Sequence, residues 1–335
     1  MPAQTLYFGG GTPSLLDAKE IAAVISQLRV SGRLAAQAEI TLEANPEDLS
    51  SEMLHALRAS GVNRLSLGIQ SFEAETLRWL GRKHSSEDAR KVILDARAAG
   101  FEKLSVDLIV GVPGEKRPQI GEQIQWLSGL VGHISVYLLT VEATTPLVGL
   151  IDQGKRQAPS EDDQADAFEW VQHEMQEAGY GQYEISSYAK VGEESRHNRL
   201  YWAKGSYLGL GPGAHSMRLC QDGSVVRRHN RPDYAAWAKK PASLQTEEET
   251  LLPEQAFLEA LAFGIRDMAA GIDLSALHLR HQVGPVKGLT GILSQMKELG
   301  WIEERGSRIH LTPLGARFAD AVAREVLSCD LTRSG

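Results

Sequence analysis

The chain has 335 residues and a formal net charge of −8, with 42% hydrophobic and 23% charged residues. These values are typical of a globular protein with room for two domains, and they argue against long disorder. The acidic balance argues against broad nucleic-acid binding, which needs cations to displace counterions. No apolar run approaches the ~18 residues of a membrane span, and the N-terminus lacks the basic and apolar pattern of a secretory signal.

Strand and helix signals alternate over the first 190 residues. Apolar runs typical of strands begin at positions 5, 38, 64, 103, 133 and 183, and segments with apolar residues at helical spacing separate them. Units of this size predict a parallel sheet with right-handed crossovers, and both an open doubly wound sheet and a barrel fit the pattern. In either fold the chemistry belongs at the carboxyl ends of the strands.

Polar and glycine-rich residues come at those strand ends. Gly9-Gly10-Gly11-Thr12 follows the first strand, Glu43 ends the second, Gln70 follows the third and Asp107 lies within the fourth. Exposed N–H groups in a glycine turn suit a carboxylate or phosphate, although glycine clusters are also common in tight turns. A carboxylate within an apolar strand is costly unless it is paired, and a buried salt bridge with Arg82 is the alternative to a ligand. We expect these polar side chains to face one common mouth.

The remaining chain changes character. Residues 191–245 are expected to form a loop-rich connection that contains His197-Asn198-Arg199-Leu200-Tyr201-Trp202 and a second glycine-rich segment, Gly209–Ser216. A neutral imidazole can bind iron or another borderline metal, and aromatic rings can stack on a flat ligand. The alternative is a surface loop anchored by its aromatic side chains. The glycine-rich segment is either a second ligand-facing loop or a backbone corner.

Residues 246–335 are expected to form a C-terminal domain. Pro253–Met268 and Val286–Leu299 have helical spacing, two short strands surround Arg305-Gly306-Ser307, and Pro313–Val326 is a last helix. Helices followed by a hairpin and a further helix resemble a winged-helix module.

Several motifs, taken in order, resemble one family. They are Tyr7–Leu16 (YFGGGTPSLL), Thr41–Pro46 (TLEANP), Ser66–Phe72 (SLGIQSF), Leu80–His84 (LGRKH), Asp107–Gly114 (DLIVGVPG) and Leu311–Gly315 (LTPLG). This order, over nearly the whole chain, resembles the radical S-adenosylmethionine (SAM) proteins related to oxygen-independent coproporphyrinogen III oxidase. The His197-Asn198-x-x-Tyr201-Trp202 element is similar to the heme-chaperone (HemW) branch, which is proposed to bind heme and pass it to recipient proteins.

The resemblance implies a fold and two ligands. Residues 1–190 would form a partial (β/α)6 barrel, without its first β/α unit, that holds SAM at its mouth. The SAM-site positions of the family correspond to Gly10, Gly11, Thr12, Glu43, Gln70, Arg82 and Asp107. His197 would bind the heme iron, with Tyr201 and Trp202 near the macrocycle.

The sequence departs from the family in its cysteines. Family members carry a Cys-x-x-x-Cys-x-x-Cys loop, upstream of the Gly-Gly-Gly-Thr-Pro turn, that holds a [4Fe–4S] cluster. Here that turn begins at Gly9, and only Cys220 and Cys329 are present, too few for a cluster, a cysteine-based zinc site or a disulfide framework. We therefore expect two free thiols, a cytoplasmic location, no deoxyadenosyl radical from this chain and weak SAM binding. A truncated or wrongly started sequence is favoured over a short cluster-free product, because the remaining motifs have meaning only around SAM.

The leading hypothesis is therefore a heme chaperone that binds heme and transfers it to recipient proteins. The first alternative is an oxygen-independent coproporphyrinogen III oxidase of porphyrin biosynthesis, against which the His-Asn-x-x-Tyr-Trp element argues. The second is a winged-helix regulatory protein, against which the negative net charge argues.

Overall fold

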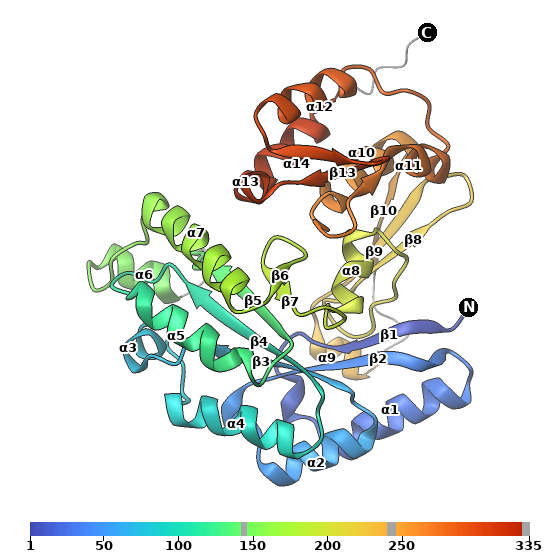
Figure 1. Cartoon of the computed structure of the whole chain (residues 1–335). Helices are drawn as coiled ribbons and strands as arrows, with labels where there is room; N and C mark the ends of the chain where they lie inside the picture. Colours follow the sequence, from blue (N-terminus) through green and yellow to red (C-terminus); the bar gives the residue numbers. More distant parts are fainter. Residues whose placement is uncertain (142–145, 240–245, 330–335) are drawn as a thin grey trace. The chain divides into compact units, whose positions relative to one another are not determined.

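The computed structural model describes residues 1–141, 146–239 and 246–329 (Figure 1). The chain divides into two compact units, Met1–His197 and Asn198–Gly335. Among the described residues, every helix is too short or too polar to cross a bilayer.

A seven-stranded sheet is the frame of the first unit. Its strands are β1 (Ala3–Phe8), β2 (Leu34–Ala44), β3 (Arg64–Gln70), β4 (Lys103–Val110), β5 (His133–Leu138), β6 (Gly181–Gln182) and β7 (Ser187–Ala189). They are ordered β1-β2-β3-β4-β5-β7-β6, and every pair from β1 to β5 is parallel. The order follows the chain without the reversal that defines a doubly wound sheet, so the prediction of a partial barrel is confirmed.

Helices connect these strands. They are α1 (Ala18–Val30), α2 (Ser51–Ser60), α3 (Ala74–Trp79), α4 (Ser86–Ala98), α5 (Arg117–Ser128), α6 (Pro146–Asp152) and α7 (Glu161–Glu177), with the short 3-10 turns η1 (Pro13–Leu15) and η2 (Pro46–Asp48). Side-chain oxygens of Asp17, Ser50, Ser85 and Ser160 accept hydrogen bonds from N–H groups of the first turns, which fixes where α1, α2, α4 and α7 begin. Figure 1 shows α1, α2, α4 and α5 along one side of the sheet.

The sixth predicted strand, Tyr183–Tyr188, differs from the prediction. In its place the chain forms a hairpin of β6 and β7, closed by a hydrogen bond from the Tyr183 N–H to the Ser187 carbonyl at 3.1 Å. The second strand of this hairpin, β7, pairs antiparallel with β5. The prediction of a parallel sixth strand is therefore wrong, because a turn this short reverses the chain and cannot make a crossover.

The two faces of this sheet differ in chemistry. One set of alternate residues, including Ile40, Leu42, Leu65 and Ile134, is fully buried and joins the helices in the main core. The other set is mostly polar and is called the polar face from here on: Thr5, Tyr7, Glu39, Thr41, Glu43, Arg64, Ser66, Ser105, Asp107, His133, Ser135 and Tyr137. The strand period of two separates the sets, and the parallel registers keep each set on one side.

The second unit begins with a small sheet in the segment that the sequence predicts to be loop-rich. The elements are α8 (Arg196–Trp202), which starts in the first unit, β8 (His215–Leu219), β9 (Val225–Asn230), α9 (Tyr234–Lys239) and β10 (Thr246–Leu251). The antiparallel sheet has the order β10-β9-β8. The sequence signal is weak because only Met217, Val225 and a few neighbours of these strands are apolar and packed.

The C-terminal elements follow the winged-helix order of helix, strand, two helices and a hairpin. They are α10 (Pro253–Gly264), β11 (Ile272–Asp273), α11 (Leu274–His281), α12 (Leu289–Glu298), β12 (Ile302–Arg305), β13 (Arg308–Leu311), α13 (Pro313–Arg317) and α14 (Ala319–Leu327). Their sheet has the order β11-β13-β12, which confirms the predicted hairpin. The sequence analysis missed α11, which begins where the Asp273 side chain accepts from the Ala276 N–H, and the predicted last helix is interrupted at Phe318.

Candidate functional site

The glycine turn after β1 is joined to the end of β2. Gly10 and Gly11 have φ angles of +76° and +59°, in the left-handed region that favours glycine. The Gly10 N–H donates to Glu43 Oε2 at 3.2 Å. Thr12 precedes Pro13, the first residue of η1. The Gly10 N–H therefore ties the exposed turn to the Glu43 carboxylate.

Tyr7 links this carboxylate to the polar face. Its hydroxyl donates to Glu43 Oε1 at 2.6 Å. Burial and then the negative charge of Glu43 raise the pKa of Tyr7 above its ordinary value, so the phenol stays protonated and remains a donor. The sequence analysis did not select Tyr7, although alternation along β1 and its register against Thr41 place it on the polar face.

Asp107 lies on the same face, two strands away. It is partly buried and accepts a long hydrogen bond, 3.5 Å, from the Ser66 hydroxyl. Burial raises the pKa of Asp107 to about 6, and a hydrogen bond with Ser135 opposes the rise while the charge of Glu43 adds to it. The described residues show no ion pair between Asp107 and Arg82, so the salt bridge considered from the sequence does not form. Asp107 is a carboxylate with spare hydrogen-bonding capacity.

The structure places the other two predicted residues differently. Gln70 ends β3 with a φ of +67°, and a methyl group at Gly68 would lie 3.1 Å from Gln70 Nε2 and 3.3 Å from Asn45 Oδ1. Gln70 therefore lies close to Asn45, just beyond the end of β2. Arg82 follows α3 and its N–H donates to the Leu77 carbonyl. Its guanidinium is not joined to Glu43 or Asp107 by any contact within the described part of the chain.

His197 is held against β1 and β2 of the first unit. Its Nδ1 lies 2.8 Å from Thr5 Oγ1, its ring stacks on Tyr7 with centroids 4.7 Å apart, and its backbone N–H donates to Glu39 Oε1 at 3.0 Å. Burial lowers the pKa of His197, which favours the neutral imidazole that can ligate a metal. Because Tyr7 contacts both His197 and Glu43, it joins the proposed heme ligand to the proposed SAM position.

The aromatic residues of the same motif make their described contacts within the second unit. Tyr201 packs against Tyr207 with ring centroids 4.6 Å apart, and Trp202 lies 5.9 Å from the Arg266 guanidinium. The buried Trp202 Nε1 has no acceptor among the described residues.

Part of the polar face is a buried polar layer. Arg64, which is 1% exposed, lies 3.5 Å from Glu39 and donates to the Ser105 hydroxyl at 2.9 Å. His133 Nε2 lies 2.8 Å from the Tyr183 hydroxyl, and burial followed by the charge of Arg64 lowers the pKa of His133. The sequence analysis missed this layer, whose only signal is a polar residue at every second position of β2 to β5.

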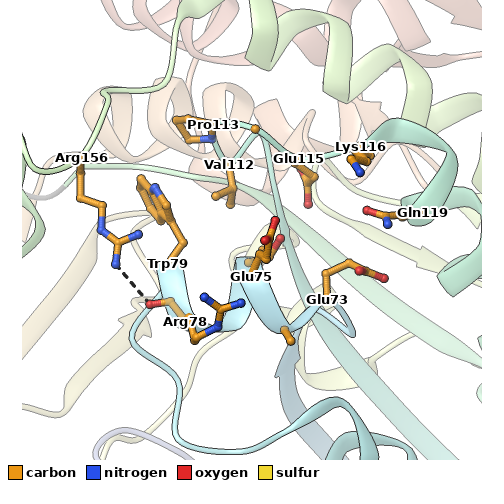
Figure 2. A pocket seen from close by; sticks show the side chains of 13 residues that line it. Glu73, Glu75, Arg78, Trp79, Val112, Pro113, Glu115, Lys116, Gln119 and Arg156 are labelled. Carbon is orange, nitrogen blue, oxygen red and sulfur yellow. Dashed lines mark hydrogen bonds between the residues drawn. The ribbon is translucent and has the colours of Figure 1, made fainter.

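A cavity of about 490 Å³ lies between α3 and the loop that follows β4 (Figure 2). The Arg156 guanidinium lies 5.3 Å from the centre of the Trp79 ring and donates to the Arg78 carbonyl at 3.3 Å. Glu115, another lining residue, accepts from the Gly111 N–H at 2.9 Å, and burial raises its pKa to about 7. Val112, Pro113 and Gly114 of the DLIVGVPG motif line this cavity, but the expected SAM-site residues and His197 do not.

Comparisons with known proteins agree with this architecture. The model of the radical SAM superfamily matches residues 1–127. The heme chaperone HemW of Bacillus subtilis is 33% identical over 327 residues, which cover 95% of this chain and 84% of that protein. The mitochondrial radical S-adenosyl methionine domain-containing protein 1 of Bos taurus is 36% identical over 316 residues, which cover 90% of this chain and 69% of that protein.

The chain belongs to the HemW family of radical SAM proteins. A solved structure, coproporphyrinogen III oxidase (HemN) from Escherichia coli, has a TM-score of 0.77 at 20% identity and covers 97% of this chain and 78% of that one. At this identity the likeness concerns the fold alone, and it extends over both units.

The described residues fit one of the two groups that a radical SAM protein holds. The positive-φ glycines of an exposed turn, together with Glu43 and Asp107, suit a ligand that carries a carboxylate, a cationic centre and hydroxyl groups. They do not fit an iron–sulfur cluster, because Cys220 and Cys329 both lie in the second unit and no described group of three side chains could hold a metal ion. No radical step is therefore assigned to these residues.

Proposed function

We propose that this HemW-family protein is a heme chaperone, which binds heme through His197 and passes it to recipient proteins. The observation that carries the proposal is the placement of the His197 imidazole, which Thr5 and Tyr7 orient and whose pKa is lowered by burial, so that the neutral form is favoured. A neutral ring fixed at one nitrogen is typical of an axial iron ligand. The relatives named as heme chaperones support the same function.

We further propose that SAM lies at the mouth of the partial barrel. The residues that would contact it are Gly10, Gly11, Thr12, Glu43, Gln70, Arg82 and Asp107. In this role the turn N–H groups bind the ligand carboxylate, and Glu43 and Asp107 bind its cationic centre or hydroxyl groups. When bound, SAM would supply its sulfonium group at this position. Binding is expected to be weak, because the described residues offer no cluster to anchor the ligand.

A reducing compartment such as the cytoplasm is part of the proposal, and the two free thiols support it. The oxidase alternative rests on a likeness of fold, since the structural relative is only 20% identical. The winged-helix order of the C-terminal elements is compatible with a partner surface, but the net charge of −8 does not favour a nucleic acid.

Heme titration of the purified chain tests the role of His197. We expect His197→Ala to lose the Soret shift of the ligated iron and to bind heme about tenfold or more weakly, because an axial ligand is missing. His55→Ala, which removes an exposed histidine of α2, is the matched control and should bind heme like the wild type. An unchanged spectrum and affinity in His197→Ala would exclude this residue as the ligand.

Thr5→Val tests the contact that orients the imidazole, in the same heme titration. This change removes the hydroxyl next to Nδ1 and leaves the imidazole in place. We expect a weaker effect than that of His197→Ala, seen as a broadened or shifted Soret band, because the ring loses one of its orienting contacts. Circular dichroism of each variant verifies that the fold is retained.

A further inference from the structure

The small sheet of the second unit carries a row of metal-ligating residues. In the register of the sheet, His215 of β8 is directly opposite His229 of β9, and Glu247 of β10 is directly opposite His229 on its other side. The three residues therefore lie on the same face, one on each strand. None of them belongs to the site described above.

The two imidazoles of this row are stacked face to face. Their ring centroids are 4.1 Å apart and the planes differ by 9°. His215 is exposed and His229 is partly buried, so the pair is open to solvent. Directly opposed strand residues have Cβ atoms about 4.5–5.5 Å apart, a separation from which rotated rings can share an ion with metal–nitrogen distances of about 2.0–2.1 Å.

The neighbouring positions leave negative charge at this pair. The segment beside β8 pairs with it through Tyr207 and Met217, which packs the Gly209 backbone against the His215 carbonyl. One step further along the same face, Arg227 is already engaged by Glu249 and by Glu259 of α10. Glu247 forms no ion pair within the described chain, so its charge remains for a ligand of the histidines.

We propose that His215 and His229 chelate a divalent transition-metal ion such as Zn²⁺ or Ni²⁺, with Glu247 supplying negative charge beside it. Imidazole nitrogen is a preferred ligand of these ions. The described residues hold no ready-formed group of three ligating side chains, so the two imidazoles are the primary ligands and water fills the remaining positions. Such a site is open and exchangeable. It goes beyond the proposed heme function, because it uses no residue of the first unit.

Calorimetric titration of the metal-free full chain with Ni²⁺ tests the proposal. We expect one equivalent to bind, and we expect His215→Ala and His229→Ala each to weaken binding about tenfold or more, because either change removes one of two primary ligands. The double variant should not bind. His173→Ala, which removes an exposed histidine of α7, should bind Ni²⁺ like the wild type.

Thermal unfolding separates loss of the site from loss of the fold. Without metal the double variant should melt like the wild type, and Ni²⁺ should raise the melting temperature of the wild type only. Wild-type Ni²⁺ affinity in both single variants would overturn the proposal. So would a double variant that keeps Ni²⁺ and loses heme, since the pair would then serve heme iron. The heme proposal at His197 is tested separately, by the heme titration of His197→Ala.

Discussion

The two faces of the seven-stranded sheet are built by the same strands but serve different ends. On the helix-covered face, Leu42, Leu65 and Ile134 are fully buried among apolar neighbours. On the polar face, Arg64 and Glu39 are almost as deeply buried, yet they form an ion pair and hydrogen bonds. Burial alone therefore does not separate core from site in this protein. The residue chemistry at alternate strand positions does, because a buried charge is tolerated only when its partners are kept.

The largest effect is expected from removing one member of the buried ion pair. Arg64→Met leaves the Glu39 carboxylate without its cation and should lower the free energy of unfolding by about 3–5 kcal/mol, measured in urea. The double variant Glu39→Leu/Arg64→Met is the control and should recover much of this loss, because it leaves no unpaired charge. A single variant as stable as the wild type would show that the two faces do not differ in this way.

On the helix-covered face the expected loss has another cause. Leu65→Ala removes a fully buried side chain and leaves a cavity, which should cost about 2–5 kcal/mol in the same assay. Val30→Ala, at a position of α1 that is 86% exposed, should change stability by less than about 0.5 kcal/mol. Here a second substitution on the polar face should not rescue Leu65→Ala, since the lost packing has no charge partner.

A substitution of Asp107 on the polar face should raise stability, whereas the two changes above lower it. Its pKa is raised from 3.8 to about 6, so the folded state binds the proton more tightly and stability falls as the pH rises through this range. Asp107→Asn removes that dependence. We expect the variant to be about 1–3 kcal/mol more stable than the wild type at neutral pH, with the difference closing near pH ~4. Urea unfolding across this pH range measures it, and an equal loss of stability at every pH would contradict the assignment.

The smallest effect is expected at the glycine turn. Gly10→Ala places a side chain at a φ of +76° with no neighbour within 4 Å, so the cost comes from the backbone alone and should be about 1 kcal/mol. Gly129→Ala is the control, since that residue has a φ of −81° and equally open space. It should be neutral or stabilising by up to about 1 kcal/mol. Equal behaviour of the two variants in thermal unfolding would remove the conformational reason for glycine in the turn.

The parallel strands and several of the residues at their ends could be predicted from the sequence, and the reason is physical. Strands β2 to β5 contain apolar residues that must be buried, and parallel strands bring their carboxyl ends together, so the neighbourhood of Gly10, Glu43 and Asp107 follows from the pattern. Arg82 did not follow, because it lies in a connection whose path is set by tertiary contacts. The small sheet of the second unit also escaped prediction, since charged residues such as Arg227 and Arg228 alternate there with few packed ones.

The role of Tyr7 depends on tertiary structure and could not be predicted from the sequence. An aromatic residue in a strand is ordinarily a core residue, and nothing local distinguishes a Tyr that packs inward from one that donates to a carboxylate. Only the register against Thr41 and the path of the chain to His197 assign its role. The ion pair of Glu39 and Arg64 was missed for the same reason, because each residue is unremarkable until the neighbouring strand is in place.

The double engagement of Tyr7 has a thermodynamic consequence. A ligand that binds Glu43 in place of the Tyr7 hydroxyl removes the hydrogen bond that holds the Tyr7 ring. The imidazole of His197, which stacks on that ring, is then less firmly positioned. Any such influence must run equally in reverse, since two binding events that share one element change each other's affinity by the same factor. If SAM and heme bind as proposed, one phenol thereby makes occupancy at the barrel mouth and ligation at the histidine depend on each other.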